Sequence, residues 1–445
     1  MAGAGACHQV SVPRKGPVMT DLRGLWLLSA ALTVVLLPAG CDATAGEAPA
    51  GTRAPAVEGA GLTDAPLPAW RTELLEIAFE AGSAFPLKPF AKNRARARQQ
   101  VVEACLQLDQ PKRAATYVVA ISNWRRGMGY AHLACYLAER GQGDTAERYL
   151  ELAATYGTDP LLEWRGDRVR IRMAQAHVLL GHTEKAERLE KGVVPSEQGK
   201  VLAAKTVTAG EDCFETHMRE VDHLISEKHM DSTTNALASS AEIYDRYFAD
   251  AARRALVEEK IRTAFATLPA FARIDLLLEM AGVAVERGDR GKAQELVDEA
   301  DEILRTHRWP LEYRIPLTAR VAASHFRAGA EEKGRAGAKA ALDLYDTHRE
   351  YTPAMHRADL LRPVADAYHA MGEEATALDL YRQAVDEGFR NTAIRPRIDD
   401  LVDTCCSMAL KGVEPDANLL ARIRGIRTAI LAEARRVQEA INEQW

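Results

Sequence analysis

Four side chains that bind metal ions in other proteins, Cys213, His217, His223 and His229, lie within one short stretch of this sequence. Cys213 and His217 are four residues apart, so a helix would place both on one face, as a pair of zinc ligands requires. His223 and His229 do not continue that face at a recognised ligand spacing. The pattern therefore favours a solvated helix over a metal centre, and we expect no metal and no other cofactor.

Motifs for catalysis are missing elsewhere in the chain. The stretch from Gly329 to Ala336 has the glycine spacing of a phosphate-binding loop, but it lacks the Lys and the Ser or Thr that contact phosphate and Mg²⁺. Neither a Gly-x-Ser-x-Gly elbow nor a His-Glu-x-x-His helix occurs. We therefore expect no catalytic residues and no enzymatic activity. The cysteines of the predicted helices, Cys105, Cys135, Cys213, Cys405 and Cys406, are expected to be mostly buried free thiols.

The N-terminus has the layout of an export signal. An uncharged run of apolar residues, 24–37, follows Arg14, Lys15 and Arg23 and precedes small residues. The run is too short to span a membrane, which takes about 20 apolar residues. Met19 begins a normal short signal of its own and is an alternative translation start.

The small residues end in Cys41. The stretch Leu-Pro-Ala-Gly-Cys at 37–41 resembles the lipobox of bacterial lipoproteins, although its Leu lies four residues before the Cys and not three. The resemblance implies that residues 1–41 are a signal peptide and that Cys41 carries lipid. It also implies an exported lipoprotein of the cell envelope, on the periplasmic face and held to the membrane by that lipid. The alternative is cleavage after Ala45 and plain secretion.

The composition narrows the classes of partner. The 445 residues are 47% hydrophobic and 27% charged, with a net charge of −6. This is the composition of a folded soluble body and excludes a polytopic membrane protein and a mainly disordered chain. No basic excess points to nucleic acid. Residues 42–70, rich in Ala, Gly and Pro, are predicted to be a tether.

The rest of the chain repeats itself. Six glycines each follow a small residue by seven positions and precede another small residue by five. These glycines are Gly141, Gly181, Gly288, Gly329, Gly372 and Gly412. A glycine can end one helix in a left-handed conformation, and Ala at the crossing lets two antiparallel helices approach closely. The pattern predicts an all-α fold, an α-solenoid of antiparallel helix pairs with a period of about 40 residues.

Three segments, GQGDTAERYLELA, RGDRGKAQELVDEA and MGEEATALDLYRQA, resemble the turn and second helix of the tetratricopeptide repeat. The resemblance covers most of residues 95–425 and implies a scaffold that binds another protein or peptide. We predict N-terminal repeats over 71–192, an irregular or degenerate segment over 193–250, C-terminal repeats over 251–415 and a capping helix over 416–445. Around Asp109 a unit without the glycine is expected.

The resemblance also implies a binding surface, because the first helices of such pairs line a concave groove. Residues at fixed offsets before each turn glycine are expected to face it. The predicted groove residues are Met128, Glu139, Arg168, Ile171, Gln175, Val178, Phe326, Arg327, Asp359, Arg362, Asp366 and His369. Its N-terminal half would be apolar, with Ile171 and Val178 receiving the partner's apolar side chains, and its C-terminal half charged. The alternative is that the tether or a neighbouring helix covers the apolar half and that the charges are only an exposed ladder.

The leading hypothesis is thus an exported, membrane-tethered scaffold without chemistry of its own. One alternative is a structural subunit of an envelope complex, and another is an enzyme that uses the irregular middle segment.

Overall fold

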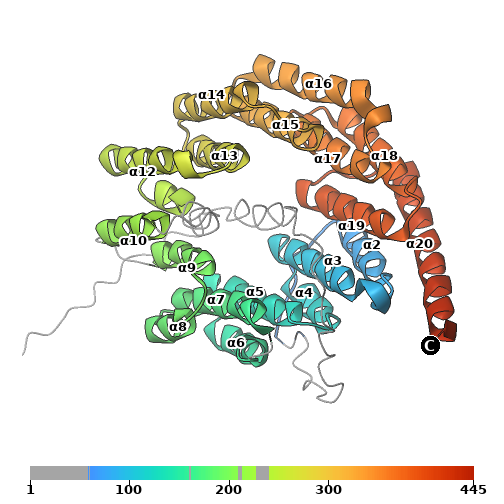
Figure 1. Cartoon of the computed structure of the whole chain (residues 1–445), viewed down its shortest axis with the longest axis horizontal. Helices are drawn as coiled ribbons and strands as arrows, with labels where there is room; N and C mark the ends of the chain where they lie inside the picture. Colours follow the sequence, from blue (N-terminus) through green and yellow to red (C-terminus); the bar gives the residue numbers. More distant parts are fainter. Residues whose placement is uncertain (1–58, 60, 160–161, 209–212, 227–239, 445) are drawn as a thin grey trace, which may run out of the picture. The chain divides into compact units, whose positions relative to one another are not determined.

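The computed structural model describes residue 59 and residues 61–159, 162–208, 213–226 and 240–444 (Figure 1). Cys41, the predicted signal peptide, most of the predicted tether and His229 lie outside these residues. All regular secondary structure in the described part of the chain is helical. In the same part, each helix is too short or too polar to cross a bilayer.

The helices follow one another with short connections. In chain order they are α2 (Ala69–Ser83), α3 (Leu87–Gln107), α4 (Pro111–Val119), α5 (Arg125–Glu139), α6 (Gly143–Gly157), α7 (Trp164–Leu179), α8 (Thr183–Glu190), α9 (Pro195–Thr208), α10 (Phe214–Ser226), α12 (Ala251–Ala264), α13 (Ala270–Glu286), α14 (Arg290–Thr306), α15 (Leu311–Arg327), α16 (Glu331–His348), α17 (Ala354–Ala370), α18 (Glu374–Phe389), α19 (Ile394–Lys411) and α20 (Ala417–Gln444). Residues 240–246 are also helical.

The predicted turns are confirmed. All six turn glycines have a positive φ, between 72° at Gly141 and 92° at Gly329, which L-residues with a Cβ rarely adopt. Asp109 takes the same role between α3 and α4 with a φ of 55°, so the expected unit without a glycine is present. Helices joined by these turns pack against each other, as in α5 with α6 and α17 with α18. The all-α fold of antiparallel helix pairs is therefore confirmed.

Nearly all the small residues of the repeat lie where helices cross. In four units an alanine five residues after the turn glycine is fully buried, as Ala146 is. In four units an alanine twelve residues after it is fully buried, as Ala153 is. Ala417 is the exception and is exposed. After the other turn glycines the second helix begins two residues later, whereas α20 begins five residues after Gly412. The longer connection moves Ala417 away from the crossing.

At one crossing even Ala is too large. Gly334 on α16 takes the place that Ala has in other units, and a Cβ there would lie 2.8 Å from Cβ of Phe326 and 2.9 Å from the Ala322 carbonyl oxygen. Gly334→Ala should lower the free energy of unfolding by about 1–3 kcal/mol, because helices α15 and α16 must move apart. Thermal or urea unfolding measures it.

The matched control is Gly282→Ala on α13, where a Cβ meets no atom within 4 Å. It should raise stability by about 0.5–1 kcal/mol, since Ala is the better helix former. Equal effects at the two positions would contradict the close helix approach at Gly334.

The start of the body lies earlier than predicted. Residues 61–68 were assigned to the tether, but Asp64 Oδ1 accepts hydrogen bonds from the backbone N–H groups of Lys112 (2.8 Å) and Arg113 (3.3 Å). Because these are the unpaired donors in the first turn of α4, Asp64 caps that helix from a distance in sequence. The Ala65 N–H also donates to the Asp109 carbonyl oxygen at 2.8 Å.

The array of helices closes on itself. Helices α2 and α3 from the start of the body pack against α19, and α2 also contacts α20 (Figure 1). Arg424 Nη2 on α20 lies 2.7 Å from Glu73 Oε2 on α2, and Gln100 Nε2 on α3 donates to Asp403 Oδ1 on α19 at 2.7 Å. A single hydrophobic cluster contains buried residues from α2 to α7 and from α15 to α20. The first and last helices thus share one core.

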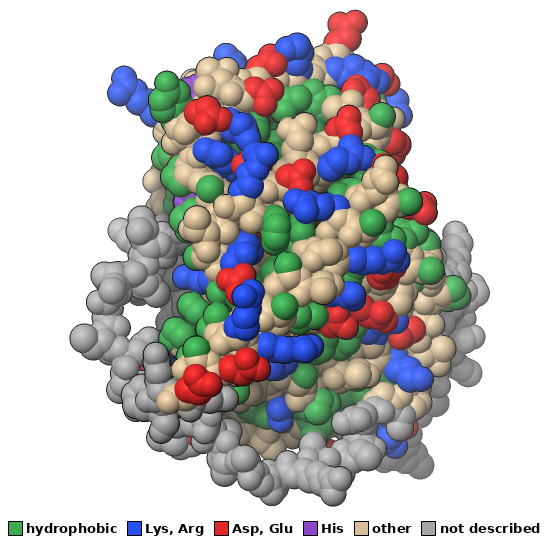
Figure 2. Space-filling view, turned by 90° about the vertical axis from the view of Figure 1, so that its right-hand side faces the viewer, with side chains coloured by type: hydrophobic (Ala, Val, Ile, Leu, Met, Phe, Trp, Pro, Cys, Tyr) green, Lys and Arg blue, Asp and Glu red, His purple; other side chains and the backbone are tan. Residues whose placement is uncertain are grey.

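Helix α20 was predicted to be a capping helix with one apolar face. That face is buried, with Leu419, Ile423, Ile426 and Ile430 at most 3% exposed. Its basic residues pair with acids of other helices, as Arg422 Nε does with Asp386 Oδ1 at 3.0 Å. Figure 2 views this side of the molecule, where basic and acidic side chains are intermingled. Helix α20 therefore packs on the first helix of the body as well as on the last pair.

Candidate functional site: the charged face of the first helices

The first helices of successive pairs pack on one another: α3 on α5, α5 on α7, α13 on α15, α15 on α17, and α17 on α19. The second helices mainly contact their own partner and the first helix of the next pair. Since the first helices have the closer neighbours, the array curves toward them. We call their solvent side the first-helix face.

Polar side chains line this face at one repeat position. The residues nine positions before each turn are Gln100, His132, Arg172, Glu279, Arg320, Pro363 and Asp403. All except Pro363 are polar or ionisable. The groove was predicted from residues thirteen, ten, six, three and two positions before each turn glycine, and position nine lies between the second and third of these.

Burial perturbs the ionisable groups of this face. It raises the pKa of Glu103 and Asp403 above the ordinary carboxyl range, and it lowers the pKa of Lys200 on the adjoining helix α9. In each case loss of hydration, which disfavours the charged form, is the main cause. Such a concentration of perturbed groups is a feature of functional sites.

One network on the C-terminal part of the face is organised around Arg362. Its Nη2 pairs with Asp359 and lies 3.3 Å from Asp403 Oδ2, and its Nη1 lies 3.5 Å from Asp400 Oδ1. Asn391 Nδ2 donates to Asp400 Oδ2 at 2.9 Å. Arg362 is 9% exposed and Asp400 5%. One guanidinium thus neutralises several buried or half-buried carboxylates and joins α17 to α19.

Asp366 is held in a similar way. It accepts hydrogen bonds from the Tyr381 hydroxyl and from Ser407 Oγ, which lies 3.2 Å from Asp366 Oδ1. Loss of hydration raises the pKa of Asp366, and the nearby Lys411 opposes this. Asp359, Arg362 and Asp366 therefore belong to packed networks, not to a simple exposed ladder.

Two acids, Glu279 and Glu242, lack a neutralising partner of comparable strength. Burial, and then the charges of Glu242 and Asp275, raise the pKa of Glu279 to about 8. Burial, and then Asp245 and Glu139, raise the pKa of Glu242 to about 7. Glu279 Oε2 is buried and accepts no hydrogen bond from the described residues. Arg320 is the one nearby cation that opposes the shift at Glu279, and its Nη1 is already bound to Asp275 Oδ1 at 2.6 Å.

The raised pKa of Glu279 makes stability depend on pH. Below the unfolded value near 4.5 the group is protonated in both states, and as pH rises toward about 8 the unfolded chain loses its proton first, so stability falls. Glu279→Gln should remove this slope, stabilising the protein by about 1–2 kcal/mol at pH 8 and by much less at pH 5. Urea unfolding at the two pH values measures the difference. A gain of equal size at both would contradict the shifted carboxyl.

The apolar half of the predicted groove is wrong. Ile171 and Val178 are 1% and 6% exposed and lie in a cluster with Ala186 and Val201. Helix α9, which packs on α7, covers them. Cover by a neighbouring helix was the alternative, and it is confirmed. The weak periodicity of residues 193–250 left the position of that helix unpredicted.

Some of the remaining predicted groove residues pair with other side chains or backbone groups of the chain, and others are accessible to solvent. Arg168 Nε pairs with Glu197 Oε1 at 3.1 Å, Gln175 donates to the Lys200 carbonyl, and His369 Nδ1 lies 2.8 Å from Glu374 Oε2. Four others remain partly or fully exposed: Met128, Glu139, Phe326 and Arg327.

Among the described residues, the members of the cluster first considered for metal, Cys213, His217 and His223, form no group whose ligand atoms lie close together. His217 is 3% exposed, whereas His223 is exposed, so the two face different surroundings. The expectation of a solvated helix is wrong at His217, whose pKa is lowered by burial. The described cysteines are free thiols, buried except for the half-buried Cys213, as expected.

Comparison with known proteins identifies no family for this chain. No family model and no curated protein matches the chain. Among solved structures, a "circular tandem repeat protein with novel repeat topology and enhanced subunit contact surfaces" matches 84% of this chain and 98% of its own, with 15% identity and a TM-score of 0.26. The regular turns and paired helices make this chain a helical repeat protein.

Proposed function

We propose that this protein is an exported, membrane-tethered scaffold that binds a segment of another protein on its first-helix face and has no chemistry of its own. The observation that carries the proposal is the set of desolvated charges of both signs on that concave face. A charged group that has already lost part of its hydration loses less hydration free energy when a partner covers it. A partner of opposite charge then adds a favourable electrostatic interaction.

Helices α13 and α15 have the most suitable surface. Glu279 on α13 and Glu242 in the helical residues 240–246 are acids without full neutralisation. Arg327 on α15 is exposed, and its Nε donates a long hydrogen bond of 3.4 Å to the Ala323 carbonyl oxygen. A protein segment with both an amine and a carboxylate would satisfy these groups together. The partner is thus expected to be a polar, mixed-charge segment, and not a peptide that places apolar side chains against Ile171 and Val178, as the sequence alone suggested.

Site-specific photocrosslinking in the native cell envelope tests the site. A photoreactive residue at Gly282, which has open space around its missing Cβ, should form one defined crosslinked product. The same residue at Lys339, exposed on α16, should not. Adding Arg327→Glu should abolish the Gly282 product without changing the melting temperature. A product that survives Arg327→Glu, or that forms equally from Lys339, would move the binding site away from the first-helix face.

The tether is supported by the lipobox-like stretch; in architecture only, the chain resembles tetratricopeptide lipoproteins of the cell envelope. Cys41→Ala should prevent lipid attachment and leave the protein unanchored, because the thiol is the acceptor. Metabolic labelling with a fatty-acid analogue and membrane fractionation measure both effects. An unlabelled wild-type protein, or a labelled Cys41→Ala variant, would contradict the lipoprotein assignment and favour plain secretion.

A further inference from the structure

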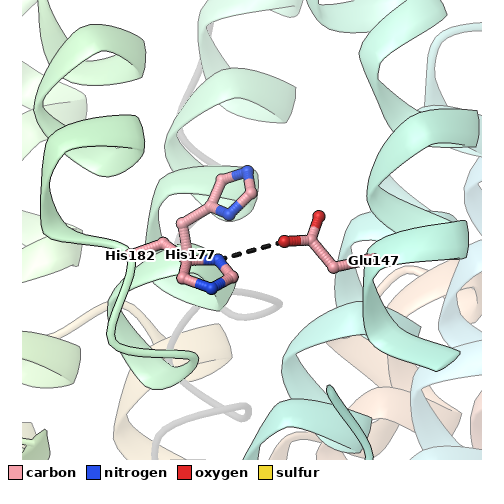
Figure 3. Close-up of side chains that lie close together, drawn as sticks. All are labelled: Glu147, His177 and His182. Atoms are coloured by element: carbon pink, nitrogen blue, oxygen red, sulfur yellow. Dashed lines mark ion pairs between the residues drawn. The ribbon is translucent and has the colours of Figure 1, made fainter. Parts of the chain in front are cut away.

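Three side chains from consecutive repeats meet beside the turn at Gly181 (Figure 3). Glu147 lies on α6, His177 on the last turn of α7, and His182 is the residue before α8. One possible ligand atom from each lies within 4.8 Å of those of the other two. Among the described residues no other group of three His, Cys, Asp or Glu side chains meets this criterion.

The repeat architecture explains why they meet. Gly181 has a φ of 77°, and this turn lets the His182 N–H donate to the His177 carbonyl oxygen at 2.8 Å. The two imidazole rings then lie side by side, with centroids 5.8 Å apart. Packing of α6 against α7 brings Glu147 to the same point, and its Oε1 lies 3.0 Å from His182 Nδ1.

His177 supplies a second, independent observation. It is 7% exposed, and its buried Nδ1 has no hydrogen-bond partner in the described part of the chain. A buried polar nitrogen without a partner costs free energy, and binding a metal ion would satisfy it.

We propose that Glu147, His177 and His182 bind a divalent transition-metal ion of the Zn²⁺ type. Two imidazole nitrogens and one carboxylate oxygen are a donor set that Zn²⁺ uses, with the fourth position left for water or another ligand. The hard cations Mg²⁺ and Ca²⁺ prefer oxygen donors and do not suit this set. The ion would join the α5–α6 pair to the α7–α8 pair, and so would stabilise the contact between two repeats.

Lys185 is the competitor at this site. Its Nζ lies 2.9 Å from Glu147 Oε1, the same oxygen that pairs with His182. The Lys185 side chain is 46% exposed, so it can swing into solvent when a cation takes its place. The lysine and the metal ion are therefore alternative partners of one carboxylate, and removing the lysine should favour the ion.

Zinc titration of the tag-free, chelator-treated full chain tests the proposal, with a chromophoric zinc chelator as the competitor. The wild type should bind one Zn²⁺. His182→Ala and Glu147→Gln, both at partly exposed positions, should each weaken binding roughly 100-fold, and His177→Ala should do the same if it folds. Lys185→Met should tighten binding roughly 10-fold. His223→Ala, on α10, is the control and should leave the affinity unchanged.

Co²⁺ provides a second readout through its visible absorption, which is intense in a four-coordinate site. Zn²⁺ should also raise the melting temperature of the wild type and of Lys185→Met but not that of His182→Ala. No stoichiometric binding by the wild type, unchanged affinity in His182→Ala and Glu147→Gln, or weaker binding by Lys185→Met would each overturn the proposal.

Discussion

Replacing Arg362 by Met should lower the free energy of unfolding by about 3–5 kcal/mol, the usual cost of removing one member of a buried ion pair. Arg362 and Asp400 are 9% and 5% exposed, and Arg362 is the cation that pairs with both Asp400 and Asp403. Met fills much of the same volume, so the loss is one of charge and not of packing. Asp400 would then be a buried carboxyl without a neighbouring cation. Its negative charge either remains, at a cost in stability, or is removed by protonation.

The loss should grow between pH 7 and pH 9. Burial, the main cause, already raises the pKa of Asp400 to about 8 while Arg362 opposes the shift, and removing Arg362 raises it further. Below about pH 7 the folded carboxyl is protonated in both proteins, so the difference between them is constant. As pH rises through about 8, the folded carboxyl of the wild type ionises and that of the variant does not, so the variant loses more stability. Urea unfolding at both pH values measures the effect.

Two companion variants separate charge from packing. Asp359→Asn removes the half-exposed partner of the same Arg362 and should cost less than about 1 kcal/mol. Adding Asp400→Asn to Arg362→Met should recover part of the loss, since the amide keeps the shape but carries no charge. If the double variant were no more stable than Arg362→Met, the ion network would not be the source of the stability.

Cys406→Asp should destabilise the protein by about 3–5 kcal/mol and loosen both ends of the chain at once. Cys406 is 3% exposed on α19, which packs on α3. Burial, and then Cys405, Asp403 and Cys105, raise the pKa of its thiol well above the usual value, which places it near Cys105 of α3. A carboxylate there has no cation and lies in the core that closes the array.

Hydrogen exchange distinguishes closure from an open array. In the closed array, Cys406→Asp should speed amide exchange on α2 and α3, some 300 residues away in sequence, as well as on α19. In an open array, where each repeat contacts only its neighbours, α2 and α3 would stay protected. Ala417→Asp, at an exposed site in the first turn of α20, is the control and should change stability by less than about 0.5 kcal/mol.

The local rules of the helical repeat could be read from the sequence. Gly141, Gly181 and the other turn glycines were found because a left-handed cap admits few residues other than glycine. The alanines such as Ala146 and Ala293 were found because close helix crossings admit only small side chains. The unit around Asp109 was also predicted, although it lacks the glycine.

The functional surfaces were predicted less well. The offsets identified first-helix residues such as Arg327 correctly as accessible, but they also selected Ile171, which α9 buries. The metal candidates were sought within one helix, around Cys213, whereas Glu147 and His177 are 30 residues apart and lie on two successive helices. A rule based on sequence spacing detects ligands that lie on one helix. It cannot detect ligands that different helices bring together through packing.

Turns, crossings and helix pairing are thus determined by residues close together in the sequence, because backbone conformation and the size of a side chain at a crossing act over one repeat. Closure of α2 and α3 onto α19, the need for Gly334 where other units have Ala, and the meeting of Glu147 with His177 and His182 were decided by the tertiary structure. Each depends on how far successive pairs rotate and shift relative to one another. That small displacement accumulates over many repeats and cannot be predicted from the sequence of any single repeat.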